Sequence, residues 1–262
     1  MSFSIQQLIK ESINQERETH KKKRESWYPT DLGKCLTGAY WARMGKEPIE
    51  FSDRQLRVFK VGTIFERFIT DLIDENKNGY KVELQVPVRD EKLDLSGYAD
   101  MVITTSEKRI VYEIKSIHSR AFWHMEREGG AAEHYKLQLF AYLYMLNIDE
   151  GRLLYISKDD LAISEYVVLR NNKKLEVEFL REMEILNRAW RDKKPPKPEP
   201  TIIKEGNKYK INWKARYCSY HHHCLNDENW LEKAKKEVYQ LNKVGTRKSV
   251  KNHKQETSKI KK

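Results

Sequence analysis

Three charged residues near the middle of the chain have types and spacing that suit hydrolytic chemistry. Asp100 lies in a β-branched run over residues 98–103, while Glu113 and Lys115 lie in and just beyond a second run over 109–114. A polar turn over 104–108 separates the runs, and this pattern predicts a β-hairpin. Side chains alternate along a strand, so Glu113 and Lys115 share one face, and a hairpin register exists that brings Asp100 opposite Glu113.

Two carboxylates and an ammonium group on one face of a sheet favour one kind of chemistry. Carboxylate oxygens are the ligands that Mg²⁺ and similar hard cations prefer. A lysine beside a metal-bound water orients that water and stabilises charge that develops on a phosphate. The pattern therefore indicates phosphate-ester hydrolysis. The alternative is that these residues form the solvated outer face of an edge hairpin, because short motifs often arise by chance.

The elements around the hairpin predict an α/β chain. Helical periodicity covers residues 53–73, 131–146 and 173–190, and strand-like runs cover 81–88, 151–156 and 161–169. An irregular helical stripe covers 2–22, and a short helix is expected from Thr30 or Asp31 to Ala42. We divide the chain into an N-terminal helical region (1–50), a core (51–170), a helix with a proline-rich linker (171–200), a Cys/His segment with a helix (201–241) and a basic tail (242–262).

The hairpin residues resemble a known family. The stretch from Gly97 to Asp100, followed by Glu113-Ile114-Lys115, is similar to the motif of the PD-(D/E)XK nuclease superfamily, with Ala99 where a proline often stands. The resemblance implies a restriction-endonuclease-like core. Such a core contains a helix, a mixed central β-sheet with a hairpin and a second helix packed across the sheet, here with helical N- and C-terminal extensions.

The resemblance also implies a metal site. The helix before the predicted sheet contains Gly62 and Glu66 in a G-x3-E pattern, which often supplies a further metal ligand in this superfamily. We therefore expect Mg²⁺ or Mn²⁺ to be bound by Glu66, Asp100, Glu113 and the backbone carbonyl of Ile114. Taken without the hairpin, Glu66 would be an ordinary exposed helix residue.

The helix predicted over 131–146 carries a second motif. His134, Gln138 and Tyr142 recur every four residues and so share one face of this helix. The Q-x3-Y spacing resembles the extra motif of the RecB-like branch. This implies that Gln138 and Tyr142 join Asp100, Glu113 and Lys115 as catalytic residues by orienting the strand or the metal-bound phosphate. The alternative is the polar outer face of an amphipathic helix, and the position of the helix directly after Glu-x-Lys favours the motif.

A further set of chemistry-bearing residues lies towards the C-terminus. Cys218 and Cys224 flank three consecutive histidines, and Cys35 lies far upstream. Thiolates and imidazoles at this spacing suit zinc or an iron–sulfur cluster. The set resembles the iron–sulfur branch of these nucleases, including the Cas-four-type enzymes of CRISPR adaptation, but Ala215 stands where that branch has a cysteine. The alternatives are a cluster completed by a histidine or an exogenous group, a zinc ion, or no metal at all.

Composition sets the wider limits. The chain of 262 residues is 39% hydrophobic, and it has no apolar run of the ~18 residues that a membrane span needs. No secretory signal is visible, and three cysteines argue against a disulfide framework, so we expect an intracellular, cytoplasmic protein without a membrane partner. The residues from Lys233 onward contribute +9 of the net charge of +11. The basic tail is predicted to be disordered, and it either binds phosphates non-specifically or serves as a solubilising segment.

These observations predict a metal-dependent DNA nuclease. The branch that the motifs resemble is rich in exonucleases, which implies action on DNA ends or single strands in DNA processing, recombination or CRISPR adaptation, with DNA and the proteins of a larger complex as partners. Two alternatives stay open. One is a nuclease-fold subunit that binds nucleic acid without cutting it, and the other is a structural metal-binding interaction module built around the Cys/His segment.

Overall fold

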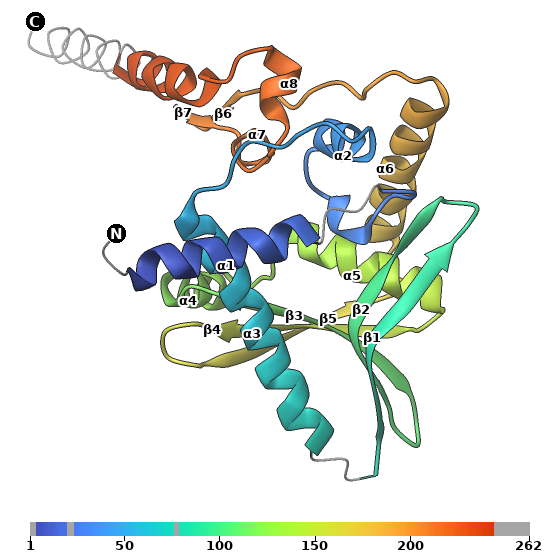
Figure 1. Cartoon of the computed structure of the whole chain (residues 1–262). Coiled ribbons are helices and arrows are strands. Elements are labelled where there is room, and N and C mark those ends of the chain that lie inside the picture. The colour runs from blue at the N-terminus through green and yellow to red at the C-terminus, as the bar shows by residue number, and fades with distance from the viewer. Residues whose placement is uncertain (1–3, 20–23, 76–78, 244–262) are drawn as a thin grey trace, which may run out of the picture.

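A five-stranded mixed β-sheet forms the centre of the molecule (Figure 1). The computed structural model describes residues 4–19, 24–75 and 79–243. Neighbouring strands pair antiparallel, except that β3 and β4 are parallel. The sheet and its helices confirm the predicted mixed α/β fold. In spatial order the strands are β1 (Lys81–Asp90), β2 (Leu95–Thr104), β3 (Arg109–Ile117), β4 (Glu150–Ser157) and β5 (Ile163–Leu169).

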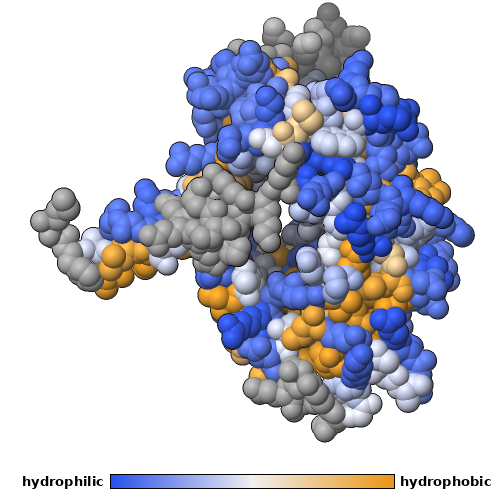
Figure 2. Space-filling view, turned by 45° about the vertical axis from the view of Figure 1, so that its right-hand side comes forward, coloured by the Kyte–Doolittle hydropathy of each residue, from blue (hydrophilic) through white to orange (hydrophobic). Residues whose placement is uncertain are grey.

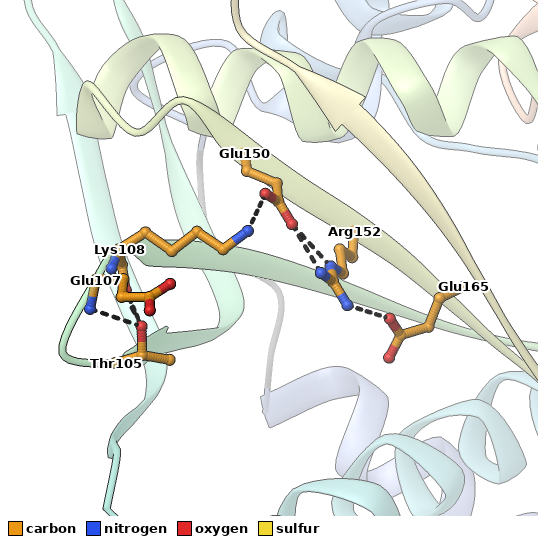
Figure 3. Close-up of polar contacts among 6 residues, drawn as sticks. All are labelled: Thr105, Glu107, Lys108, Glu150, Arg152 and Glu165. Atoms are coloured by element: carbon orange, nitrogen blue, oxygen red, sulfur yellow. Dashed lines mark hydrogen bonds and ion pairs between the residues drawn. The ribbon is translucent and has the colours of Figure 1, made fainter.

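Polar contacts fix the turn of the β2–β3 hairpin and reach across the neighbouring strands (Figure 3). Thr105 Oγ1 accepts a hydrogen bond from the backbone N–H of Lys108 at 3.1 Å. The Lys108 ammonium pairs with Glu150 on β4, and Arg152 contacts Glu150 at 2.9 Å and Glu165 on β5 at 2.8 Å. The hairpin therefore lies inside the sheet, between β1 and β4, and is not an edge hairpin.

The main hydrophobic core lies between one face of the sheet and a group of helices. Helices α4 (Ser119–Glu128) and α5 (Glu133–Leu146) make the crossover that parallel strands β3 and β4 require. Helix α5 packs on β4 and on α6 (Lys173–Arg191), which in turn contacts α2 (Leu36–Arg43). Phe140 and Phe179 meet at the centre of this layer with 5.8 Å between their ring centroids. The helix predicted over 131–146 is confirmed, and it begins two residues later than expected.

Helix α3 (Asp53–Glu75) packs against the sheet through a separate, smaller core. Ile69 of this helix contacts a cluster that contains Ile114 of β3 and Ile156 of β4. Helix α1 (Ile5–Thr19) lies beside α3 and projects from the body of the molecule (Figures 1 and 2). The predicted helix over 53–73 is therefore confirmed, and it reaches the sheet close to the hairpin that carries the charged residues.

The segment before α2 differs from the prediction. The single helix expected from Thr30 or Asp31 to Ala42 is divided into a short 3₁₀ turn, η1 (Pro29–Asp31), and α2, with Cys35 as the residue before α2. Gly33 separates them because its φ of 70° lies in the left-handed region, where a helix cannot continue. A Cβ at this glycine would lie 2.6 Å from the Cα of His134, so Gly33 also allows the loop to approach α5 closely.

The C-terminal segment contains a small hairpin that the sequence pattern did not predict. Strands β6 (Ile202–Glu205) and β7 (Lys208–Ile211) precede α7 (Trp213–Arg216), α8 (His221–Leu225) and a helix over 230–243. Trp230 and Ala234 pack there against Ala215 in a core of their own. The predicted disordered tail falls almost entirely on residues 244–262, which lie outside the described residues.

The surface is mostly hydrophilic in the view of Figure 2, with hydrophobic side chains gathered in its lower half. Among the described residues, no helix combines the length and the apolar character that a membrane span requires.

Candidate functional site

The hairpin register places Asp100 and Glu113 next to each other. Met101 of β2 pairs with Tyr112 of β3, so Asp100 and Glu113 are the next residues along the two strands. Residues that lie opposite each other in an antiparallel pair point to the same face, and the two carboxylates therefore share one region. Asp100 Oδ2 also accepts a hydrogen bond from the backbone N–H of Ile114 at 2.8 Å. The register that the sequence allowed is the one that the structure adopts.

Lys115 pairs with the Glu113 carboxylate. Its ammonium lies 5.0 Å from the ring centroid of Tyr135 on α5. Burial alone would lower the pKa of Lys115, but the charges of Glu113 and Asp100 outweigh burial and raise this pKa above its ordinary value. Burial raises the pKa of Asp100, whereas Lys115 opposes that rise. Lys115 is therefore a fixed cation inside an acidic site.

Gln138 and Tyr142 of α5 reach the same carboxylate. Gln138 Nε2 donates to Glu113 Oε1 at 2.6 Å and to the Tyr142 hydroxyl at 3.4 Å. Both side chains are only 3% exposed, so they do not form the outer face of an amphipathic helix. Glu113 itself is 1% exposed, and burial raises its pKa to about 7. The four-residue spacing on α5 thus places both polar side chains at the hairpin.

Glu66 of α3 is the third carboxylate. Burial, followed by the charge of Asp100, raises the pKa of Glu66 to about 7. Gln85 Nε2 donates to Glu66 Oε1 at 2.7 Å. Gln85 lies on β1 opposite Asp100, because its neighbours Leu84 and Val86 pair with the residues on either side of Asp100. The φ of Gln85 is 46°, which is in the left-handed region. Such a backbone in a strand interior is strained for a non-glycine residue, and strain of this kind clusters at functional sites.

The three carboxylates fit a divalent cation. Glu113 Oε2 is buried and has no hydrogen-bond partner among the described residues, so this oxygen is left available to a cation. Glu66, Asp100 and Glu113 supply the oxygen donors that Mg²⁺ and Mn²⁺ take. Within the described ranges no three such side chains enclose a metal position. Gln85, the Ile114 N–H and Gln138 each form a hydrogen bond with one of the three carboxylates. The carbonyl of Ile114 stays a predicted ligand.

A group of cationic and aromatic residues lies next to the carboxylates, and of these the sequence pattern singled out only His134. Burial, then the charge of Lys115, lowers the pKa of Lys34, and no described residue forms a hydrogen bond or ion pair with this lysine. Burial and the charges of Lys34, Lys115 and Lys214 lower the pKa of His134 to about 4, so its ring is neutral at pH 7. The ring lies 5.1 Å from that of Trp213 between centroids, and both line a groove of about 980 Å³. A cation such as Lys34, which has no carboxylate partner among the described residues, suits a phosphate.

The structure brings the three cysteines together from the two ends of the chain. Cys35 precedes α2, Cys218 lies between α7 and α8, and Cys224 lies in α8. All three are free thiols, and Cys35 interacts with both Cys218 and His221. Ala215, where the resemblance implies a cysteine, is fully buried.

Comparison with known proteins relates most of the chain to one family. The sequence matches the PD-(D/E)XK nuclease superfamily over residues 5–225. The CRISPR-associated exonuclease Cas4 of Saccharolobus solfataricus is 27% identical over 217 residues, which cover 81% of this chain and 93% of that protein. The crystal structure of SSO0001 superposes with a TM-score of 0.54 and 22% identity over 84% of this chain and 96% of that one. The alkaline exonuclease of Laribacter hongkongensis aligns with a TM-score of 0.41 and 16% identity over 64% of this chain and 96% of its own.

Proposed function

Because this chain belongs to the PD-(D/E)XK nuclease superfamily, we propose that it is a divalent-metal-dependent deoxyribonuclease that removes nucleotides from DNA ends or single strands. One observation carries the proposal. A buried carboxylate oxygen of Glu113 without a hydrogen-bond partner lies in a site that also holds Asp100, Glu66 and a paired lysine. A merely structural ion pair would not need three carboxylates with burial-raised pKa values.

Each side chain of the site has a separate role in the proposed reaction. Glu66, Asp100 and Glu113 would hold Mg²⁺ or Mn²⁺, which polarises the scissile phosphate and lowers the pKa of bound water. Lys115 exchanges its contact with Glu113 for the attacking water or the phosphate, and there it stabilises the developing negative charge. Gln138 keeps Glu113 in position from the α5 side.

The neighbouring lysines supply the contacts to the DNA strand. Lys34 and Lys214 line one pocket together with Trp213, so they lie on the same side of the molecule. Trp213 is 41% exposed on that side, and an exposed aromatic ring can stack on an unpaired base. This arrangement favours a single-stranded substrate, and the likeness to a CRISPR-associated exonuclease favours a role in CRISPR adaptation, within a complex of DNA-processing proteins.

A cleavage assay tests the proposal. End-labelled single-stranded, double-stranded and circular DNA are incubated with Mg²⁺, Mn²⁺ or EDTA. We expect metal-dependent loss of linear DNA, with circular DNA resistant. Asp100→Asn keeps the acceptor for the Ile114 N–H but removes a charge, and it should lower the rate by about 10²–10⁴-fold. Asp149→Asn is the matched control, because Asp149 has 89% of its side chain exposed and pairs only with Arg170 among the described residues.

Three results would contradict the proposal. Equal cleavage by wild type and Asp100→Asn would place the chemistry elsewhere. Cleavage of circular and linear DNA at the same rate would indicate an endonuclease. DNA binding without cleavage in any metal would favour the non-catalytic subunit.

A further inference from the structure

The cysteine–histidine cluster comprises Cys35, Cys218, His221 and Cys224, and it lies apart from the carboxylates. Cys35 and Cys218 are 5% and 8% exposed, and His221 is fully buried. Both thiols rest against Gly38 of α2, because a Cβ on this glycine would lie 2.6 Å from Cys218 Sγ and 3.8 Å from Cys35 Sγ. Only a glycine allows the sulfur atoms to approach α2 this closely.

His221 is the histidine that belongs to this cluster. Its Nε2 lies 3.3 Å from Thr201 Oγ1, while its Nδ1 is buried and has no hydrogen-bond partner among the described residues. A metal-bound histidine has this arrangement, with one ring nitrogen held by a neighbour and the other left for the metal.

The other two histidines are placed differently. His223 Nε2 lies 2.8 Å from the carbonyl oxygen of Glu47, so its ring is already engaged on the surface. His222 packs against His223 with 3.9 Å between ring centroids. Its Nδ1 is also buried without a hydrogen-bond partner among the described residues, but the charges that act on its ring are those of His223, Glu228 and His221 and not those of the cysteines. His222 is therefore a matched control for His221, because it is the next residue in the chain and the same type of side chain.

The donors do not fit the four-cysteine iron–sulfur cluster that the resemblance implies. A four-iron cluster is normally held by four cysteine thiolates, and this chain has three cysteines in total. The position expected for the fourth is Ala215, whose methyl group packs with Trp230 and Ala234 in a hydrophobic cluster. Three thiolates and one imidazole are instead a donor set of structural zinc sites.

We propose that Cys35, Cys218, Cys224 and His221 bind one structural zinc ion. The described side chains do not yet surround a common centre. They interact with one another instead, with Cys35 against Cys218 and His221, and His221 against Cys224. Zinc would replace these contacts, with Nδ1 of His221 as the nitrogen donor, and the thiols and the His221 ring would release their remaining protons to solvent on binding. The ion ties the C-terminal segment to α2 and to the loop that carries Lys34.

Elemental analysis of the full-length protein tests this assignment without reference to cleavage. We expect about one zinc per chain, no iron or acid-labile sulfide, and no brown colour, whether the protein is purified in air or anaerobically. His221→Ala should lose the zinc, His222→Ala should keep it, and His221→Cys should restore it by supplying a fourth thiolate. Circular dichroism of each variant shows whether the fold is retained.

A second measurement does not depend on any variant. Co²⁺ added to the metal-free protein should give the ligand-field and thiolate charge-transfer bands of a tetrahedral sulfur–nitrogen site, and zinc should bleach them. Stoichiometric iron with sulfide in the wild type would overturn the proposal, as would the absence of zinc and of the cobalt spectrum. A His221→Ala protein with full zinc content would exclude His221 as the fourth donor. A failure of the nuclease proposal would leave all of these readouts unchanged.

Discussion

The carboxylate site and the cysteine–histidine cluster assemble their donors in opposite ways. Asp100, Glu113 and Lys115 lie on one hairpin in the middle of the sheet, so pairing with β1 and β4 fixes their backbone whether or not a cation is present. The cysteine–histidine cluster joins the residue before α2 to a segment near the C-terminus, and the local core of that segment is built around Ala215 and Trp230. The first site would therefore need only a loosely held cation, whereas the proposed zinc ion would order the second.

One short loop joins the two regions. Gly33 packs against His134 and donates its N–H to the buried Glu182 carboxylate at 2.7 Å. Lys34 lies near Lys115, and the next residue is Cys35. Three consecutive residues thus touch α5, the carboxylate site and the cysteine–histidine cluster, so order in one region can influence the other.

The largest effect that separates the regions is expected from Lys115→Met. Cleavage should fall by about 10²–10⁴-fold, because the cation that stabilises the developing charge is lost. Zinc content should stay unchanged. Lys108→Met is the control, since Lys108 lies on the same hairpin but pairs with Glu150 at the turn. Initial rates and elemental analysis provide the measurement, and a similar loss of rate in both variants would show that the hairpin and not the ammonium is responsible.

Removal of metal should distinguish the stabilities of the two regions. A chelator that strips zinc should lower Tm by roughly 5–10 °C, because each kcal/mol shifts Tm of a chain of this size by about 2–4 °C and a bound structural ion supplies several. Withdrawal of Mg²⁺ alone should leave Tm nearly unchanged. Differential scanning calorimetry measures both. An equal shift on removing either ion would contradict the contrast between a preformed site and an ion-dependent one.

Lys34→Met should weaken the binding of single-stranded DNA by about tenfold, a loss of ~1.4 kcal/mol. The physical reason is that Lys34 is half-buried near Lys115, and no described residue forms a hydrogen bond or ion pair with its ammonium group. Lys92→Met, in the exposed turn between β1 and β2, serves as the control. Fluorescence anisotropy in EDTA separates binding from cleavage, and identical dissociation constants for both variants would remove Lys34 from the DNA path.

Glu182→Gln tests the link through Gly33 and should give the smallest effect. Burial raises the pKa of Glu182 in the folded chain to about 7, above the ~4.3 of an unfolded chain, so the wild type loses stability as pH rises from about 4 through 7. Glutamine keeps an acceptor for the Gly33 N–H but carries no charge. We expect the variant to be more stable by about 1 kcal/mol at pH 8 and no more stable than wild type at pH 5. Urea unfolding at both pH values decides this, and a variant that is less stable at pH 8 would show that the ionised form is favourable.

Local patterns in the sequence explain why much of the molecule could be predicted. The hairpin follows from two β-branched runs around a polar turn, and the convergence of Gln138 and Tyr142 follows from their four-residue spacing. Residues that reach the site through tertiary packing have no such signal. Lys34 is one of 50 lysines and arginines, and Gln85 is distinguished only by a backbone strain that no sequence pattern reveals. The short strands β6 and β7 were not predicted, because four residues are too few to show a periodic pattern.

The central position of β3 has a consequence for how the protein loses its fold. Strand β3 pairs with β2 over Arg109–Tyr112 and with β4 over Ile110–Ile117, and the Ile114 N–H donates to Asp100, so we expect the amides around Glu113 to open only when the central sheet separates. Helix α1 lies at the periphery and can open alone. In hydrogen–deuterium exchange the strand that carries Glu113 and Lys115 should therefore belong to the slowest-exchanging unit. On heating, activity would then be lost at the same temperature as the global fold and not at a lower one.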